Sequence, residues 1–160
     1  MLRITIVAVG KIKERYLTDG IAEYSKRLTP FCRLEIVEVA EEKMADNPSA
    51  ADKARALARE GERLLRAVRP GSHLTVLDLR GRQMASEELA AQLGALAVAG
   101  TSDLTFVIGG AFGLAPAVTA AAQDRLSFSS MTFTHQMIRL LLVEQLYRAF
   151  KISRGENYHH

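Results

Sequence analysis

Short apolar runs alternate with longer amphipathic stretches along most of this chain. An apolar run that closes on a glycine or a charge is typical of a strand, whereas apolar residues three or four positions apart are typical of a helix. Strands are therefore expected at residues 2–9, 32–39, 73–79, 103–108 and 126–128. Helices are expected at about residues 17–29, 50–69, 86–99 and 134–150, with a further short one that begins near Pro116. Parallel neighbours in a sheet need a crossover connection, so this alternation predicts one α/β domain, residues 1–160, with a parallel sheet of about five strands.

Several positions refine this assignment. The stretch CRLEIVEV, residues 32–39, alternates apolar and charged residues, which is typical of a strand with one wet face near a sheet edge. Ser86 is expected to be the N-cap of the helix that it begins, and Pro116 suits a first helical turn. Either Thr132 or Thr134 is expected to cap the last helix.

The last predicted helix differs from the others because it lacks a polar face. Its apolar residues cover most of the circumference: Met137, Ile138, Leu140, Leu141, Leu142, Val143, Leu146, Tyr147, Ala149 and Phe150. A helix that is hydrophobic all round is buried on more than one side. One side can pack on the sheet, and in a domain of this size the other most simply meets a second copy. The pattern therefore predicts a homodimer with a large apolar interface around this helix.

Composition and charge narrow the class of protein. Hydrophobic residues make up 48% of the chain and charged residues 24%, which are ordinary values for a globular protein. The net charge of +3 permits a nucleic-acid partner without requiring one. The single cysteine, Cys32, cannot form an internal disulfide, so the simplest setting is the reducing cytoplasm. No signal peptide is expected, and no apolar run reaches the roughly 18 residues that span a membrane.

Three loops follow predicted strands and would meet at the carboxyl end of a parallel sheet, where ligands collect. They are residues 77–82, 108–113 and 127–133, and they offer mainly backbone amides and small side chains. The second loop, IGGAFG, lacks the G-x-G-x-x-G spacing of a dinucleotide loop, and no acidic residue about 20 positions later is placed to hold a ribose. A tight strand-to-helix turn without a ligand explains this glycine cluster equally well.

Candidate reactive side chains lie at the start of the last helix and in the tail. His135 could serve as a base, an RNA contact or a polar residue near the helix cap. Arg139 is one turn further along the same helix face, so both side chains point to one region. In the tail, Tyr158, His159 and His160 with Arg154 can stack on unpaired bases, although a frayed terminus or the remnant of a purification tag gives the same pattern. The spacing of the histidines and the cysteine predicts no metal site.

Three blocks of sequence together resemble the RlmH family of SPOUT-superfamily methyltransferases, which act on 23S ribosomal RNA. They are FVIGGAFGL, LSFSSMTFTHQMIRLLLVEQLYRAFKI and the ending YHH, and the likeness extends to ITIVAVGKIKERYLTDGIAEYSKRL at the start. The chain departs from the family pattern in having Thr134 and Asn157 where prolines are usual, and both changes loosen the backbone. The resemblance implies an α/β, parallel-sheet SPOUT methyltransferase fold with a deep trefoil knot in the C-terminal half.

The resemblance also implies the ligands and the reaction. The threaded loops would form an S-adenosylmethionine pocket lined by Leu77, Gly109, Gly110, Phe128, Ser129, Ser130, Met131, Thr132 and Phe133. The family is dimeric with the last helix at the interface, in agreement with the homodimer predicted from the apolar pattern. The implied reaction is methylation of N3 of a pseudouridine in 23S ribosomal RNA, on the assembled ribosome.

Roles for the remaining candidate residues follow from this reaction. The N3 proton must leave, and His135 is the first candidate for the base and His159 the second. Arg139 and Arg154 could hold the RNA backbone or stabilise a developing oxyanion. Tyr158 and His159 would contact the RNA.

Two other functions fit parts of the sequence. A nucleotide-binding α/β oxidoreductase would use the glycine turn but needs the missing ribose acid. A non-catalytic RNA-binding or assembly factor would keep the knot without the reaction, which Thr134 and Asn157 leave open. Binding of S-adenosylmethionine supports the methyltransferase, binding of a dinucleotide supports the oxidoreductase, and binding of neither supports the assembly factor.

Overall fold

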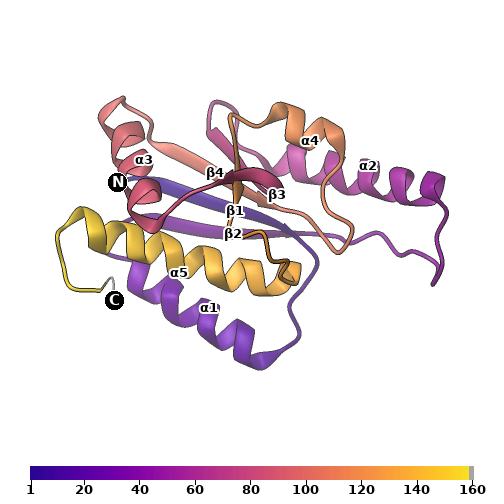
Figure 1. The fold of residues 1–160 in the computed structure, drawn as a ribbon, viewed down its shortest axis with the longest axis horizontal. Helices are drawn as coiled ribbons and strands as arrows, with labels where there is room; N and C mark the ends of the chain where they lie inside the picture. Colours follow the sequence, from indigo (N-terminus) through magenta and orange to yellow (C-terminus); the bar gives the residue numbers. More distant parts are fainter. Residues whose placement is uncertain (159–160) are drawn as a thin grey trace.

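Strands and helices alternate throughout the computed structural model, which describes residues 1–158 (Figure 1). The strands are β1 (Arg3–Val9), β2 (Arg33–Val39), β3 (His73–Gln83), β4 (Asp103–Ile108) and β5 (Asp124–Ser127). The helices are α1 (Arg15–Leu28), α2 (Ala50–Ala67), α3 (Ser86–Val98), α4 (Pro116–Ala121) and α5 (His135–Ser153). Every predicted element is therefore present, and the ends differ from the expected ones by a few residues.

The strands form one parallel sheet in the order β2-β1-β4-β3-β5. The predicted α/β class with a parallel sheet is confirmed. The register places Ile6 of β1 between Ile36 of β2 and Phe106 of β4. β2 lies at one edge, as its sequence predicted, and its side chains alternate between exposed and partly buried over most of its length.

Helices cover both faces of the sheet, so β1 is buried on both sides. On one face Ile4 and Ile6 contribute to the core beneath α1, α3 and α5. On the other face Val7 and Val9 contribute to the core beneath α2 and α4. Figure 1 shows α1 and α5 on one side of the strands and α2 with α4 on the other. This two-sided burial explains why β1 is an uninterrupted apolar run in the sequence.

The apolar helix α5 lies between α1 and α3 on the first of these faces. Its inner residues Leu142 and Leu146 are fully buried. Met137 and Leu141, one turn apart, are only partly buried and are not among the residues packed on the core. One chain therefore already covers most of α5, and Met137 and Leu141 form the apolar stripe that the core leaves uncovered.

One helix start differs from its prediction. The N-cap of α3 is Ala85 rather than Ser86, and the Ala85 N–H donates to the Glu88 carboxylate at 3.1 Å. The Ser86 hydroxyl instead donates to Gln145 of α5 at 2.8 Å, so its polarity serves helix packing. At the start of α5 the prediction is confirmed, since the Thr134 side chain caps the helix.

β3 runs further than its apolar pattern indicated. The ladder with β5 breaks after Leu77, and Arg82 and Gln83 then pair again with the end of β5. Between them Gly81 passes so close to β5 that a Cβ on it would lie 2.6 Å from the carbonyl carbon of Arg125. The end of β3 therefore bends across β5, and Figure 1 shows this crossing near the centre of the molecule.

Candidate active site

The three predicted loops come together in one cleft of about 970 Å³ at the carboxyl ends of β3, β4 and β5. The cleft is lined mainly by residues 77–80, 108–114, 126–129 and 131–136. This is the place where parallel sheets bind ligands. Every predicted pocket residue lines the cleft except Ser130, whose hydroxyl accepts a hydrogen bond from the Gln83 side chain at 3.0 Å.

The glycine turn after β4 forms one wall of the cleft. A Cβ on Gly109 would collide with the carbonyl group of Gly113, so the turn closes only with glycine there. Gly113 has a φ of +90°, in the left-handed region, and its N–H donates to the Gly110 carbonyl at 3.1 Å. At the tip, the Phe112 ring is exposed and lies 5.2 Å from the Lys53 ammonium of α2. The result is a wall made largely of bare backbone.

The end of β3 forms a second wall, which carries a fixed ion pair. The Arg125 guanidinium donates to the Asp78 carboxylate at 3.0 Å and 2.5 Å, and the Arg80 N–H donates to its other oxygen at 3.1 Å. Partial burial raises the pKa of Asp78, but these hydrogen bonds outweigh burial and hold the pKa below its usual value. Sequence reasoning gave Asp78 no role, because its partner Arg125 is on another strand.

The segment between β5 and α5 forms the third wall. The Ser127 hydroxyl donates to the Ser129 carbonyl at 3.1 Å, and the Ser129 hydroxyl accepts from the Met131 N–H at 3.0 Å. These local bonds fix the turn. They also leave Met131 and Phe133 exposed at the cleft, with 75% and 44% of their surface accessible.

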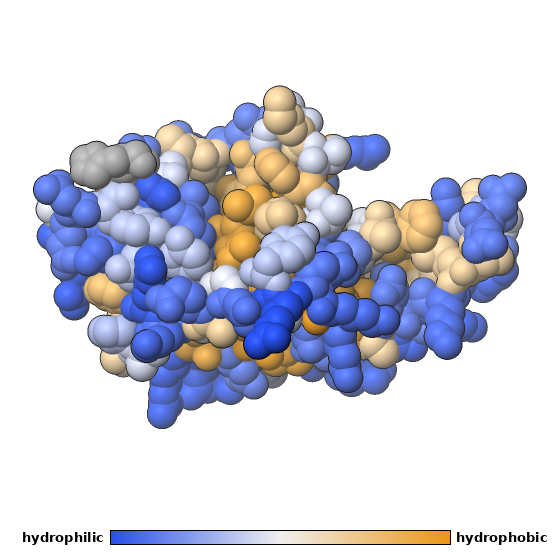
Figure 2. Space-filling view, turned by 90° about the horizontal axis from the view of Figure 1, so that it is seen from below, coloured by the Kyte–Doolittle hydropathy of each residue, from blue (hydrophilic) through white to orange (hydrophobic). Residues whose placement is uncertain are grey.

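Large apolar side chains gather at the mouth of the cleft. Those that are both exposed and part of its lining are Leu79, Phe112, Met131 and Phe133. A cluster of exposed apolar residues marks a binding surface. Figure 2, seen from the side on which α1 and α5 lie, shows apolar residues gathered in the middle of this face between hydrophilic flanks.

His135, the first residue of α5, lines the cleft and is partly buried. Burial lowers the pKa of its imidazole; the negative charge of Glu41 opposes this shift, and the positive charge of Arg139 adds to it. Because the net pKa lies below the usual value, the imidazole is neutral near neutral pH and can accept a proton.

Arg139 lies deeper than His135 and points into the body of the protein. Its side chain is 3% exposed and forms an ion pair with Glu38 at 2.5 Å. It also donates to the Gly10 carbonyl at 3.0 Å. The structure therefore uses Arg139 to tie α5 to the carboxyl ends of β1 and β2, and does not bring it to the cleft beside His135.

The tail folds back on α1 and α5, away from the cleft of its own chain. The Tyr158 hydroxyl donates to the Tyr24 hydroxyl at 3.2 Å, and the Tyr158 ring packs edge-on against Tyr147 with centroids 4.9 Å apart. At 1.5 Å per residue, Tyr147 lies roughly 18 Å beyond His135 along the helix axis. Tyr158 is therefore a docked residue, and the expectation of a frayed tail does not hold for it.

The other predicted tail contacts are also remote from the cleft or lie outside the described residues. The Arg154 guanidinium lies over the Phe31 ring, 4.6 Å from its centroid, and 3.8 Å from the Glu156 carboxylate. His159 and His160 lie outside the described residues. A site that uses both the cleft and the described tail would therefore need the tail of a second chain.

Metal binding, a reactive cysteine and a membrane-spanning helix are three further possibilities for the described residues. No group of three or more His, Cys, Asp and Glu side chains within residues 1–158 is placed to hold a metal ion. Cys32 is buried, and burial raises the pKa of its thiol to about 11, which disfavours the nucleophilic thiolate. Among the same residues, no helix has the length and apolar character to cross a membrane.

Solved structures with a similar fold include several methyltransferases. One is a probable methylase family protein from Haemophilus influenzae, with a TM-score of 0.53 at 16% identity, covering 99% of this chain and 70% of that one. Another is a tRNA (m1G37) methyltransferase from Aquifex aeolicus, with a TM-score of 0.54 at 8% identity, covering 92% of this chain and 69% of that one. A family profile described as "Predicted SPOUT methyltransferase" matches residues 2–159. The fold and the profile define the class: a SPOUT methyltransferase.

Closer relatives narrow this class. The protein named ribosomal RNA large subunit methyltransferase H from Pelotomaculum thermopropionicum is 53% identical over 160 residues, covering 100% of both chains. The protein of the same name from Symbiobacterium thermophilum is 56% identical over 160 residues, covering 99% of both chains. The chain therefore belongs to the ribosomal RNA large subunit methyltransferase H family, and the resemblance seen in its sequence blocks is confirmed.

Proposed function

We propose that residues 1–160 form one methyltransferase domain that transfers a methyl group from S-adenosylmethionine to N3 of a pseudouridine in 23S ribosomal RNA. The proposed substrate is the assembled ribosome, in the cytoplasm. The observation that carries the proposal is the convergence of three chain segments on one cleft that also contains the partly buried His135. The names of relatives that are more than half identical support ribosomal RNA as the substrate class.

The lining of the cleft fits S-adenosylmethionine. Its volume of about 970 Å³ is within the range of small-molecule sites. Leu77, Leu126 and Ile138 offer apolar surface for an adenine ring, and the glycine turn offers backbone groups with no side chain in front of them. These residues, with the segment before α5, would hold the cofactor. When bound, the cofactor supplies an electrophilic methyl group on a sulfonium.

The chain's own part in the reaction is to orient the target base and to remove a proton. N3 of a pseudouridine carries a proton that must leave as the new bond forms. His135 lines the cleft and is neutral near neutral pH because burial lowers its pKa, so we assign it the role of base. We assign Arg139, which is buried against Glu38, the role of holding the first turns of α5 in place.

We also infer that the C-terminal half contains a trefoil knot. β5 lies at the sheet edge beside β3, yet α5, which follows it, lies between α1 and α3. Residues 127–134 thus lead from the edge back beneath the end of β3 and its connection to α3. The close approach of Gly81 to the backbone of Arg125 supports this crossing.

We propose that the active unit is a homodimer joined along α5. Met137 and Leu141 form a stripe that is not packed on the core, and Met131 and Phe133 in the preceding segment are exposed. Association of two copies would remove this apolar surface from water. Sedimentation of the purified protein at twice the mass of one chain is the expected result.

The dimer also gives the tail a function. In one chain the docked Tyr158 lies far along α5 from His135, so only a second chain can bring a tail to the cleft. We propose that the tail residues that contact the RNA are Arg154, Tyr158 and His159. Because phosphate contacts release counterions, RNA binding should weaken steeply as salt is raised.

A methyl-transfer assay with labelled S-adenosylmethionine tests the proposed function directly. Assembled ribosomes and free ribosomal RNA are compared, and the product is located by mass spectrometry. We expect one methyl group on a single pseudouridine of 23S RNA, with ribosomes the better substrate. Cofactor binding without transfer to either would refute the substrate, and failure to bind the cofactor would refute the methyltransferase activity.

The variant His135→Ala tests the assignment of the base. Loss of a general base should slow single-turnover methylation by about 10²- to 10⁴-fold. Affinity for S-adenosylmethionine, measured by calorimetry, should change little. A single-turnover rate close to that of the unaltered protein would rule out His135 as the base.

A further inference from the structure

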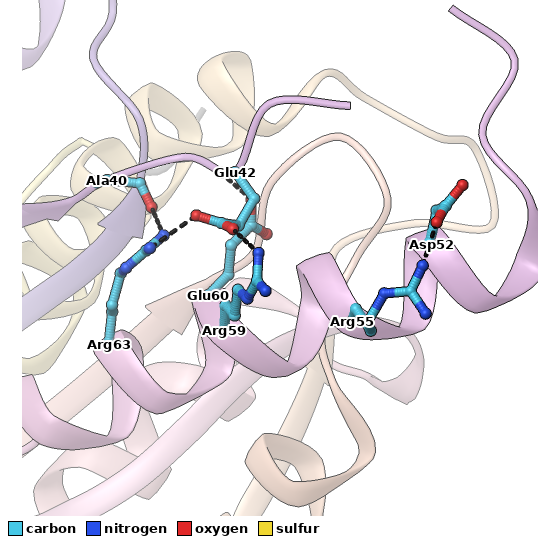
Figure 3. A network of polar contacts seen from close by, with 7 residues as sticks. All are labelled: Ala40, Glu42, Asp52, Arg55, Arg59, Glu60 and Arg63. Atoms are coloured by element: carbon cyan, nitrogen blue, oxygen red, sulfur yellow. Dashed lines mark hydrogen bonds and ion pairs between the residues drawn. The ribbon is translucent and has the colours of Figure 1, made fainter. Parts of the chain in front are cut away.

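The loop between β2 and α2 is fastened to α2 at two points (Figure 3). The Ala40 carbonyl accepts a hydrogen bond from Arg63 at 3.0 Å. The Glu42 carboxylate lies between two guanidinium groups, 3.2 Å from Arg59 and 2.6 Å from Arg63. The Glu42 N–H donates to the buried carboxylate of Glu60 at 3.0 Å. Positions 40 and 42 are therefore both held on α2.

Glu41, between these two fastened positions, is exposed and lies against the end of β1. Its carboxylate packs on Gly10 at the end of β1, where a Cβ on the glycine would lie 3.4 Å from the Glu41 Oε2. The Gly10 carbonyl accepts a hydrogen bond from Arg139, which is one helical turn beyond His135. Through Gly10 the Glu41 carboxylate is thus close to Arg139 in the first turns of α5. At this place its negative charge favours a higher pKa for His135.

The other charges around His135 do not replace Glu41. On α5 itself, Arg139 opposes a positive charge on the imidazole. Glu38 on β2 is engaged by Arg139 at 2.5 Å and balances that guanidinium. The charged side chains on the β3 wall of the cleft are Asp78 and Arg80. Arg125 pairs with Asp78 as Arg139 pairs with Glu38, whereas Glu41 has no ion-pair partner among the described residues. Glu41 is therefore the acid available to balance a protonated His135.

We propose that Glu41 is a positioning residue whose carboxylate stabilises the imidazolium that forms when His135 takes the N3 proton from the target base. This rests on the proposed function, in which His135 is the base. N3 would give its proton to the imidazole and form a bond to the methyl group, while the pair of electrons that bound the methyl group would stay on the donor sulfur as a neutral thioether. The positive charge of the donor would thus reappear on His135. The bonds that Arg59 and Arg63 donate to the loop, and the one that Glu60 accepts from it, hold the loop so that the counter-charge is in place before the reaction begins.

Two measurements on the variant Glu41→Gln test this proposal. This substitution keeps the shape of the side chain and removes its charge, and Asp46→Asn, in the same loop, is the matched control. The first measurement is the pKa of His135 by NMR titration, with the signal assigned by its loss in His135→Gln. We expect a lower pKa in Glu41→Gln, because a charge that favours the imidazolium is gone, and no change in Asp46→Asn.

The second measurement is the pH dependence of single-turnover methylation. The base must be neutral to act, so the rate rises with pH through the pKa of His135. In Glu41→Gln this acidic limb should move to lower pH, and the plateau rate should fall roughly fivefold because His135 becomes a weaker base. Affinity for ribosomes should hold or improve, since a negative charge has been removed near RNA. Simple damage to the loop would weaken binding as well as the rate.

The two measurements separate failure of this proposal from failure of the proposed function. An unchanged His135 pKa in Glu41→Gln would overturn the role of Glu41, whatever the base is. A lowered pKa with an unmoved rate profile would show that His135 is not the base, and would remove the catalytic role of Glu41 with it. The proposal would be supported if Glu41→Gln lowered the pKa of His135, moved the acidic limb of the rate profile to lower pH and kept its affinity for ribosomes.

Discussion

The first turns of α5 and its last turn are held in different ways, although one continuous helix joins them. At the cleft end, His135 is partly buried and Arg139 is 3% exposed. The Nε of Arg139 is buried and has no hydrogen-bond partner among the described residues. At this end of α5, charged and titratable groups are therefore buried without enough hydrogen bonds to replace all those that water would make.

The far end of α5 closes with its backbone groups satisfied. The Gly155 N–H donates to the Ile152 carbonyl at 2.9 Å, and the Glu156 N–H donates to the Lys151 carbonyl at 3.0 Å. This is the Schellman motif, and Gly155 provides the left-handed φ of +67° that it needs. The Glu156 carboxylate also pairs with the Lys151 ammonium, so the chain turns back in a fixed direction.

The contrast shows where this fold accepts a cost in free energy. An incompletely bonded polar group in the interior destabilises the folded state, and a protein keeps such groups mainly where chemistry requires them. In α5 the incompletely bonded group is Arg139, one turn beyond His135 of the cleft, while the end that docks the tail obeys the local rules for helix termination. The same contrast orders the effects expected from substitution.

The largest effect should come from the cleft that the first turns of α5 help to line, with the variant Gly109→Ala in the turn after β4. A Cβ there would lie 2.8 Å from the carbonyl carbon of Gly113, which is backbone and cannot rotate away. The turn must open, at a cost of about 1–3 kcal/mol in the free energy of unfolding, which is typical of overpacking. We expect S-adenosylmethionine binding, measured by calorimetry, to weaken by two orders of magnitude or more, because the turn is a wall of the cleft.

Gly94→Ala is the matched control, since nothing lies within 4 Å of the added Cβ at this position in α3. Alanine is the better helix former, so this variant should be more stable by roughly 0.5–1 kcal/mol and bind the cofactor normally. Normal cofactor affinity in Gly109→Ala would show that the glycine turn does not shape the site.

The same contrast explains which parts of the fold the sequence could predict. The strand and helix assignments depend on local periodicity, and they are confirmed for all the elements, including edge strand β2. The end of β3 was missed because residues 80–83 are polar and glycine-containing, and their pairing is decided by the crossing with β5. The local pattern of apolar and polar residues does not predict a pairing that depends on a strand elsewhere in the sequence.

Prediction of the site had the same limit. The three loops and His135 were found because parallel sheets gather ligands at the carboxyl ends of their strands. One-turn spacing gave Arg139 the right helix face, but spacing along a helix does not reveal depth. Its partner Glu38 is 101 residues away in sequence, so only the folded structure shows that Arg139 is engaged within the protein.

A smaller difference, about 1–2 kcal/mol in the free energy of unfolding, should separate substitutions of the two members of that buried pair. Glu38 keeps 37% of its side chain exposed, whereas Arg139 keeps 3%. Glu38→Ala leaves a guanidinium that cannot reach water, and should lower the free energy of unfolding by about 3 kcal/mol. Arg139→Met leaves a carboxylate that water can solvate, and should cost less, about 1–2 kcal/mol.

Urea unfolding of both variants measures this asymmetry, with Asp19→Ala as control. Asp19 pairs with Arg15 on the surface, where their side chains are 71% and 92% exposed, so its loss should change stability by less than about 0.5 kcal/mol. If Arg139→Met proved the more destabilising variant, packing of the arginine side chain, rather than its unbalanced charge, would be the dominant contribution.

The smallest effect should come from the far end, with the variant Tyr158→Phe. It removes the hydroxyl that donates to Tyr24 at 3.2 Å and, more weakly, to Glu144 at 3.5 Å, and it leaves the ring contact with Tyr147 in place. One neutral hydrogen bond contributes about 0.5–1.5 kcal/mol, and here the loss should stay local to the tail. Hydrogen exchange of the Tyr158 amide, which donates to the Glu156 carbonyl at 3.0 Å, should quicken, while the unfolding midpoint hardly moves.

Tyr16→Phe serves as the control for this variant, because Tyr16 is 67% exposed on α1 and its change should leave tail exchange unaltered. Faster exchange at the Tyr158 amide in Tyr158→Phe alone would show that the hydroxyl pair holds the tail. Unaltered exchange would mean that the Schellman turn and the ring contact suffice. The cleft end and the far end would then differ more sharply, because the far end would tolerate loss of a partner and the cleft end would not.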